Sequence, residues 1–419
     1  MSLWPSDVSD LLVPLKHTCL INPEALSEAT DPDFTFNYID IGSVTFGQGV
    51  TKRERMSFGH APSRARKLVK TDDVIISTVR TYLRAIAKIA PEDDRQVVST
   101  GFAVCRPNEG IDPDYLYYVT QSAPFVDQVV SSSSGISYPA INPSTLGCIK
   151  LPLPRKEIQS DVAAFLDRET VEIDNLIKKK ARFIDLLKEK RSALITRAVT
   201  KGINSGVPMK DSGVDWLGRI PQHWQVVPAT ALFTESKERA RDGDQMLSAT
   251  QKYGVIPLAE FEALEQRQVT KAVTNLEMRK HVEVGDFVIS MRSMDGGLER
   301  ARAVGSVRSS YSVLRPGPHV DGRFYGALMK CSLYVQALRL TSNFIRDGQD
   351  LNFSHVRKVR LPKLDLQEQA AIADHIEAET TRIDALTAKT ERSIDLLKEK
   401  RSALITAAVT GRIDVRAAA

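Results

Sequence analysis

Basic side chains gather in two stretches of the chain that also contain aromatic residues and glycines. Lysine and arginine neutralise phosphates, and arginine also reads guanine edges, so these residue types suit DNA binding. Each residue taken alone is more often solvated surface. Both stretches flank the same pair of predicted strands, however, which favours a DNA-binding face in each half of the chain. The candidates are Lys52, Arg53, Arg55, Arg64, Arg66, Lys67, Arg80, Tyr82 and Arg84 in the first stretch, and Arg279, Lys280, Arg292, Arg300 and Arg302 in the second.

Two small polar segments that contain glycine occupy matching places in the two halves. They run from Ser131 to Tyr138 and from Thr341 to Gln349. Loops of this composition are typical of segments that approach a ligand closely, although ordinary solvent loops look alike. They add six candidates to the predicted DNA face: Ser134, Ser137, Tyr138, Asn343, Arg346 and Gln349.

The residue patterns of common nucleic-acid enzymes are missing from the sequence. The chain has no G-x-x-x-x-G-K-[ST] loop for ATP phosphates. The nearest approach to an adenine methyltransferase motif, Asn142-Pro143-Ser144-Thr145, lacks the required aromatic residue and is better explained as a turn before a helix. The seven histidines are dispersed, without the spacing of metal ligands. We therefore expect no catalytic residue, no metal and no cofactor in this chain.

Composition places the chain among ordinary globular proteins. Its 419 residues, 42% apolar and 26% charged, suffice for two or three domains. The net charge of +5 permits nucleic-acid binding without demanding it. No apolar run approaches the ~20 residues that span a membrane, no secretory signal is visible, and the four cysteines are scattered. We expect a cytoplasmic protein without membrane contact.

An internal repeat organises the sequence. Residues 184–200 read IDLLKEKRSALITRAVT and residues 394–410 read IDLLKEKRSALITAAVT, so 16 of 17 positions agree at an offset of 210. The likeness continues upstream and fades to a skeleton of predicted strands, Asp73–Ser77 with Gly101–Pro107 in one half and Asp286–Ser290 with Ser310–Pro316 in the other. Each half therefore consists of a variable mixed domain followed by a near-invariant helix.

Each near-invariant segment is predicted to be one long helix. Apolar residues recur at helical spacing, and Gly202 and Gly411 stand where a helix commonly ends. A helix of ~40 residues is ~60 Å long, which suits a coiled coil better than burial in a small domain. The expected seam is Ile173, Leu176, Phe183, Leu187 and Leu194 with Ile383, Leu386, Leu397 and Leu404. Pairing between two molecules is an alternative, but two such seams in one chain favour an antiparallel pair with pseudo-twofold symmetry.

These observations predict an α+β fold with two mixed α/β recognition domains separated by two long antiparallel helices. The predicted boundaries are 1–152 for the first recognition domain, 153–203 for the central helix, 204–222 for a linker, 223–362 for the second recognition domain, 363–413 for the C-terminal helix and 414–419 for a tail.

The tandem plan resembles the specificity subunits of type I restriction–modification systems over essentially the whole chain. The resemblance is carried by VIISTVRTYLRAIAKI, VVSTGFAVCRP, INPSTLGCIKLPLP, KDSGVDWLGRIPQHWQVV and the two IDLLKEKRSALIT copies. It implies a non-catalytic subunit whose two target-recognition domains bind a bipartite site in double-stranded DNA. It also implies two methyltransferase subunits on the helices, with restriction and translocase subunits that join for cleavage. S-adenosylmethionine, ATP and Mg would then belong to those partners. A coiled-coil scaffold and a stand-alone DNA-binding regulator remain alternatives, and the recognised bases cannot be read from the sequence.

Overall fold

The chain forms two compact units in a computed structural model that describes residues 12–135, 138–269, 276–290, 293–341 and 351–416. The first unit comprises residues 1–181 with 391–419, and the second comprises residues 182–390. Each unit contains one recognition domain and a part of each long helix. None of the helices in the described ranges is both long and apolar enough to cross a membrane.

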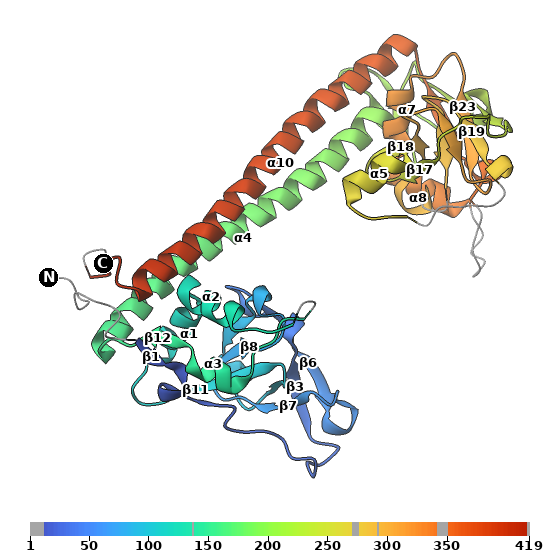
Figure 1. The fold of residues 1–419 in the computed structure, drawn as a ribbon. Coiled ribbons are helices and arrows are strands. Elements are labelled where there is room, and N and C mark those ends of the chain that lie inside the picture. The colour runs from blue at the N-terminus through green and yellow to red at the C-terminus, as the bar shows by residue number, and fades with distance from the viewer. Residues whose placement is uncertain (1–11, 136–137, 270–275, 291–292, 342–350, 417–419) are drawn as a thin grey trace. The chain divides into compact units, whose positions relative to one another are not determined.

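The two long helices are continuous. The helix predicted over 153–203 is α4, Lys156–Lys201, and the helix predicted over 363–413 is α10, Leu366–Val409 (Figure 1). α4 and α10 end two and four residues before the predicted boundaries, and Gly202 and Gly411 follow them with φ angles of 73° and 70°. Glycine adopts this left-handed conformation without a Cβ clash, and it closes the last helical turn.

Contacts inside each unit show that α4 and α10 pair in antiparallel orientation. In the first unit Arg401 Nε lies 3.1 Å from Asp174 Oδ1. In the second unit Arg191 Nε lies 3.2 Å from Asp384 Oδ1. The two arginines are 210 positions apart, as are the two aspartates, so one ion pair is made twice by the internal repeat. The predicted antiparallel pairing of the two helices within one chain is therefore confirmed.

The seam between the helices differs from the predicted stripe. Leu176, Phe183 and Leu386 were expected in the seam, but their side chains are exposed. The inward positions follow an alternating 3-4 spacing that includes polar residues, and on α4 they are Ile173, Ile177, Lys180, Ile184, Leu187, Arg191, Leu194 and Ala198. On α10 they include Thr380, Ile383, Thr387, Thr390, Ile394, Leu397, Arg401 and Leu404. The predicted stripe missed the apolar Ile177, Ile184 and Ile394 as well as the polar Lys180, Arg191 and the threonines.

The first recognition domain contains two four-stranded sheets. One has the order β2-β11-β8-β9, formed by Cys19–Ile21, Phe102–Pro107, Val74–Ser77 and Ile86–Lys88. The other has the order β6-β3-β10-β7, formed by Glu54–Ser57, Thr35–Ile39, Val97–Ser99 and Ala65–Leu68. The smaller pairs are β1 with β12, Leu12–Pro14 with Lys150–Pro152, and β4 with β5, Val44–Thr45 with Gly49–Val50. Helices α1, α2 and α3 are Pro113–Gln121, Ala123–Ser131 and Pro143–Cys148.

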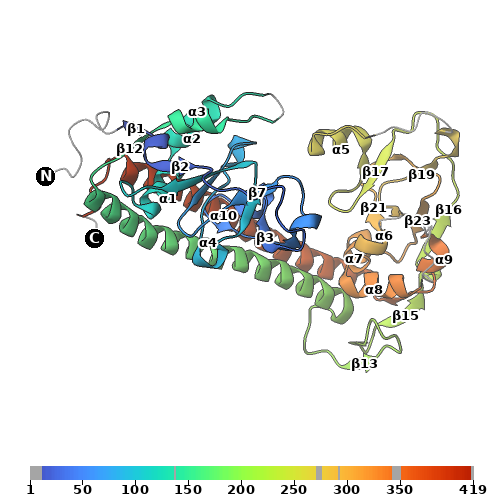
Figure 2. The same cartoon turned by 90° about the horizontal axis from the view of Figure 1, so that it is seen from below.

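The second recognition domain repeats the first of these sheets. Its order β16-β23-β20-β21 is formed by Phe233–Ser236, Ser312–Pro316, Phe287–Ile289 and Glu299–Arg300. Four two-stranded pairs accompany this sheet. Strand β15 (Gln225–Pro228) pairs with β24 (Arg360–Lys363), and β17 (Leu247–Thr250) pairs with β18 (Gly254–Pro257). Strand β19 (Lys280–Val282) pairs with β22 (Gly305–Val307), and β13 (Met209–Asp211) pairs with β14 (Arg219–Pro221). Helices α5 to α9 are Leu258–Glu265, Ser293–Gly296, Gly322–Leu328, Ser332–Leu340 and Phe353–Val356 (Figure 2).

Matching contacts hold the two domains in the same form. The predicted strands are β8 with β11 and β20 with β23, and each pair is antiparallel. The Tyr115 hydroxyl donates to the Pro152 carbonyl at 3.0 Å, and the Tyr325 hydroxyl donates to the Pro362 carbonyl at 2.7 Å. Asn142, from the rejected methyltransferase motif, is the N-cap of α3, and its counterpart Asn352 caps α9.

An arginine–aspartate ion pair also recurs in the two sheets. Arg106 donates to both carboxylate oxygens of the buried Asp73 at 2.9 Å and also contacts Glu24. In the second domain Arg315 lies 3.6 Å from Asp286 and 3.4 Å from Glu238. These arginines close the end of the sheet where β11 and β23 finish, so they belong to the framework rather than to a ligand surface.

Candidate DNA interface

The turn that follows β8 is the most constrained part of the predicted DNA face. Arg80 and Arg84 both have left-handed backbones, with φ angles of 51° and 53°, and they flank the short 3-10 helix η5, Thr81–Leu83. This conformation costs a non-glycine residue ~1–2 kcal/mol, and such residues cluster at functional sites. The sequence alone gives no sign of this backbone, because neither position is glycine or asparagine.

Side chains of this turn combine positive charge with aromatic rings. The Arg80 guanidinium lies 4.8 Å from the centre of the Tyr138 ring, and the Arg84 guanidinium lies 5.8 Å from the Phe46 ring. Tyr82 and its neighbour Leu83 are 54% and 48% exposed. The structure therefore brings together Arg80, Tyr82, Arg84 and Tyr138 from the predicted set. Phe46 and Leu83 were missed, because a lone apolar residue in a turn carries no charge signal.

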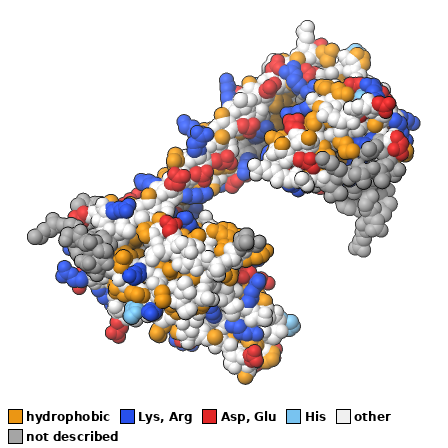
Figure 3. Space-filling model, in the orientation of Figure 1, with side chains coloured by type: hydrophobic (Ala, Val, Ile, Leu, Met, Phe, Trp, Pro, Cys, Tyr) orange, Lys and Arg blue, Asp and Glu red, His pale blue; other side chains and the backbone are white. Residues whose placement is uncertain are grey.

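The polar segment before α3 lies beside this turn. Ser134 and Ala140 exchange backbone hydrogen bonds of 2.9 Å in both directions, which closes the loop between them. The Arg80 amide donates to the Pro139 carbonyl at 2.7 Å, so the loop and the turn are tied together. Ser134 is exposed there, whereas the predicted Ser137 lies outside the described residues. Figure 3 shows apolar and basic side chains mixed on the visible face of the first domain.

The basic stretch of residues 52–67 divides into exposed charges and charges that hold the fold. Lys52 and Arg55 are exposed. Arg64 is also exposed, although it donates to the Tyr38 hydroxyl at 3.2 Å and to Asp40 at 3.1 Å. Arg66 lies 4.7 Å from the centre of the Phe58 ring and donates to the Ala65 carbonyl at 2.9 Å. Lys52, Arg55, Arg64 and Arg66 are therefore compatible with a phosphate-contacting surface.

Arg53 and Lys67 have structural partners instead. Arg53 forms a two-pronged ion pair with the buried Asp93, and these hydrogen bonds raise the pKa of Arg53. Lys67 donates to the carbonyls of Thr100 and Phe102, and burial lowers its pKa. Both charges are engaged within the domain, which gives Arg53 and Lys67 a role in holding the fold.

Arg279 and Lys280, at the start of β19, also have structural partners. Arg279 is buried, donates to the side chain and carbonyl of Ser306, and has a pKa that burial lowers. Lys280 donates to the Tyr311 carbonyl at 2.6 Å, and burial lowers its pKa as well. These contacts fasten β19 to β22 and to the turn before β23, so Arg279 and Lys280 also help to hold the fold.

Arg302 remains as an exposed candidate of the second domain, and Arg300 is half-buried. A Cβ placed on Gly322 would lie 2.8 Å from Arg300 Nε, so the arginine packs closely over this glycine. The predicted Arg292, Asn343, Arg346 and Gln349 lie outside the described residues. DNA contact by each residue of the predicted set stays a prediction.

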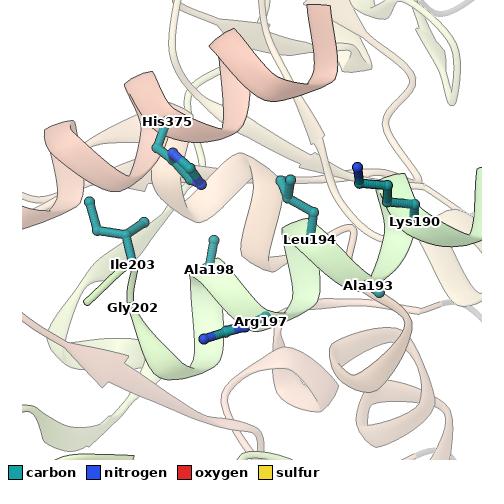
Figure 4. A pocket seen from close by; sticks show the side chains of 8 residues that line it. All are labelled: Lys190, Ala193, Leu194, Arg197, Ala198, Gly202, Ile203 and His375. Atoms are coloured by element: carbon teal, nitrogen blue, oxygen red, sulfur yellow. The ribbon is translucent and has the colours of Figure 1, made fainter. Parts of the chain in front are cut away.

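The long helices carry a second type of surface, which contains no DNA candidates. Acidic and basic side chains are both present on their visible face (Figure 3). In the second unit a groove of about 410 Å³ lies between the end of α4 and α10, where His375 extends toward Ala198 while Arg197 points away (Figure 4). Arg197 is the position at which the two 17-residue copies differ, with Ala407 as its counterpart. Exposed apolar residues on these helices, Leu176, Phe183, Leu186, Leu386 and Leu396, suit a protein partner.

Known proteins resemble this chain in sequence and in fold. A family model described as the type I restriction modification DNA specificity domain matches residues 38–182. A putative type I restriction enzyme MjaX specificity subunit of Methanocaldococcus jannaschii is 24% identical over 324 residues, 74% of this chain and 71% of that one. The type I restriction enzyme StySPI specificity subunit of Salmonella potsdam is 20% identical over 204 residues, 41% of this chain and 44% of that one.

A solved structure shares the fold over most of its length. A chain from a structure concerned with complex assembly and conformational transition of the type I restriction–modification system superposes with a TM-score of 0.70 at 22% identity, covering 96% of this chain and 98% of that chain. The matched domain, the similar proteins and the shared fold agree with the duplicated framework described above. Residues 38–182 match the type I restriction modification DNA specificity domain, and the chain shares its fold with a chain from a type I restriction–modification system.

Proposed function

We propose that this chain reads a bipartite site in double-stranded DNA, with one half-site bound by each recognition domain. The proposal rests on one observation: the two recognition domains share the same framework but differ in their exposed surfaces. Both domains repeat one sheet order, one tyrosine hydrogen bond and one arginine–aspartate pair. The exposed residues around those sheets differ, as expected if one framework presents two different base-reading surfaces.

The chain acts without chemistry of its own and directs methyltransferase and restriction subunits to the bound site. We assign S-adenosylmethionine, ATP and Mg to those partner subunits, and adenine methylation to two methyltransferase subunits. Among the described residues no group of three or more His, Cys, Asp or Glu side chains is arranged as metal ligands would be. The near-identical helices, with exposed apolar residues at matching positions such as Leu186 and Leu396, support two equivalent partner contacts.

Co-expression with the partner methyltransferase tests this function. Genome-wide methylation mapping should detect a bipartite motif when both proteins are present and none when the chain is omitted. The isolated chain should transfer no methyl group from labelled S-adenosylmethionine. Partner binding without a methylation motif would favour the coiled-coil scaffold, and site-specific DNA binding without co-purifying methyltransferase would favour the stand-alone regulator.

A further inference from the structure

Tyr82 and Leu83 form an apolar pair at the tip of the turn defined by residues 80–84. Their side chains are 54% and 48% exposed although they are adjacent and bulky. Exposed apolar residues that lie together commonly mark a binding surface. Tyr138, on the loop tied to this turn, is also exposed, and its ring lies 4.8 Å from the Arg80 guanidinium.

The turn holds this pair in a fixed place. Thr81, between Arg80 and Tyr82, is buried and its hydroxyl lies 2.9 Å from the Ser133 hydroxyl at the end of α2. The left-handed backbones of Arg80 and Arg84 bracket the pair on both sides. A turn anchored in this way loses little conformational freedom on binding, because its side chains are already presented.

The surrounding charges identify the kind of occupant. Arg80 and Arg84 place positive charge on both sides of the apolar pair, each stacked on an aromatic ring. A ligand that fits must offer negative charge at its edges and flat apolar surface between them. Phosphates on either side of stacked bases meet this description, and aromatic side chains stack on bases of any sequence.

We propose that Tyr82 and Leu83 insert between two adjacent base pairs of the first half-site and unstack that base step. The inference rests on the proposed function, since it requires that this domain bind DNA. Apolar wedges of this kind kink duplexes in other DNA-binding proteins. Pyrimidine–purine steps unstack most easily, so the wedge selects such a step at its position through the ease of deformation.

The test uses the chain in complex with its methyltransferase subunits and a duplex that carries the site found by methylation mapping. 2-Aminopurine replaces each adenine of the first half-site in turn, and permanganate reports thymines at the remaining steps. The wedge predicts increased fluorescence or reactivity at one step. Tyr82→Ala should remove this signal and weaken binding by about 10- to 100-fold, the loss expected for one stacked aromatic residue. Leu83→Ala should have a smaller effect.

Two signals serve as internal references. An adenine that a methyltransferase subunit extrudes also becomes fluorescent, and this signal should persist in Tyr82→Ala because the extrusion belongs to the partner. Signals in the second half-site should also persist, since residues 291–297, which follow β20, contain no aromatic residue. Leu20→Ala is the matched control for Leu83→Ala, because it also truncates an exposed leucine. Leu20 pairs with Arg106 at one end of the sheet, whereas Ser77, which precedes the turn of residues 80–84, lies at the other end.

The outcomes separate this inference from the proposed function. If Tyr82→Ala keeps both the distortion and the affinity, the wedge is wrong while sequence-specific binding stands. If Tyr82→Ala weakens only the association with methyltransferase subunits, the apolar pair is a protein contact and the wedge is again wrong. If the unaltered complex does not bind its mapped site, the proposed function itself fails. Circular dichroism confirms that each variant is folded.

Discussion

Arg401 and Arg191 occupy equivalent places in the two repeats, yet their surroundings differ. The Arg401 side chain is 8% exposed, pairs with Asp174, and also donates to Gln121 and to the Gly47 carbonyl of the first recognition domain. The Arg191 side chain is 43% exposed and pairs with Asp384 alone among the contacts that the described residues show. The first domain is therefore tied to the helix pair through this arginine. Near-identical helix sequences do not imply identical packing.

Truncation of these two arginines gives the largest difference that we expect between the units. Arg401→Ala should lower the free energy of unfolding of the first unit by about 2–3 kcal/mol, because buried hydrogen-bonding partners lose a charged donor. Arg191→Ala should cost the second unit about 0–1 kcal/mol, as is usual for an exposed pair. Hydrogen exchange read by mass spectrometry resolves the two units. Equal losses would show that the burial of Arg401 carries no energetic weight.

Substitution of the two buried tyrosines should lower the free energy of unfolding of the two units by similar amounts, in contrast to substitution of the two arginines. Tyr115→Phe and Tyr325→Phe each remove one hydroxyl from a buried hydrogen bond to a proline carbonyl. Each should cost its own unit about 1–2 kcal/mol and leave the other unchanged. The same exchange measurement applies, and losses that differ by more than about 1 kcal/mol would break the equivalence of the two frameworks.

A smaller effect of pH should distinguish the second unit. Burial lowers the pKa of His281, but hydrogen bonds to Asp244 and Glu283 outweigh it and raise the pKa above the ordinary 6.5. A raised pKa in the folded state contributes stability that is complete below pH ~6.5 and is lost as pH rises through the folded pKa. The second unit should therefore be less stable at pH 8 than at pH 6.

His281→Gln provides the control for this pH effect. Glutamine keeps hydrogen-bonding capacity but does not titrate, so the variant should lose the difference between pH 6 and pH 8 in the second unit. Urea unfolding followed by the fluorescence of the buried Trp224 reports this unit. A slope that persists in the variant would assign the pH dependence to another group.

Much of the fold follows from local patterns. Helical periodicity and the two glycines that end the helices placed α4 and α10 to within a few residues, and β-branched runs placed β8, β11, β20 and β23. The seam was partly wrong, because Ile177 and Ile184 lie inward where Leu176 and Phe183 were expected. Lys180 and Arg191 also occupy inward positions, which an apolar pattern cannot reveal. Such positions depend on a partner helix about 200 residues away.

The candidate site was harder to predict because charge pairing depends on distant residues. Arg53 is engaged by Asp93, Lys67 by Thr100 and Arg279 by Ser306, each at least 27 positions along the chain. In the sequence, a basic residue that pairs within the fold cannot be distinguished from one that contacts a DNA phosphate. The Arg80–Arg84 turn was found by its charges, but its strained backbone and the Leu83 partner of Tyr82 appear only in the structure.

Exchange of one recognition domain tests the central claim most directly. Residues 1–152 would be replaced by the corresponding segment of a related specificity subunit, and the methylated motif of the resulting complex would be mapped across a genome. The account predicts that one half-site changes and the other is retained, because each domain reads its own half-site. A motif in which both half-sites change, or neither does, would contradict it.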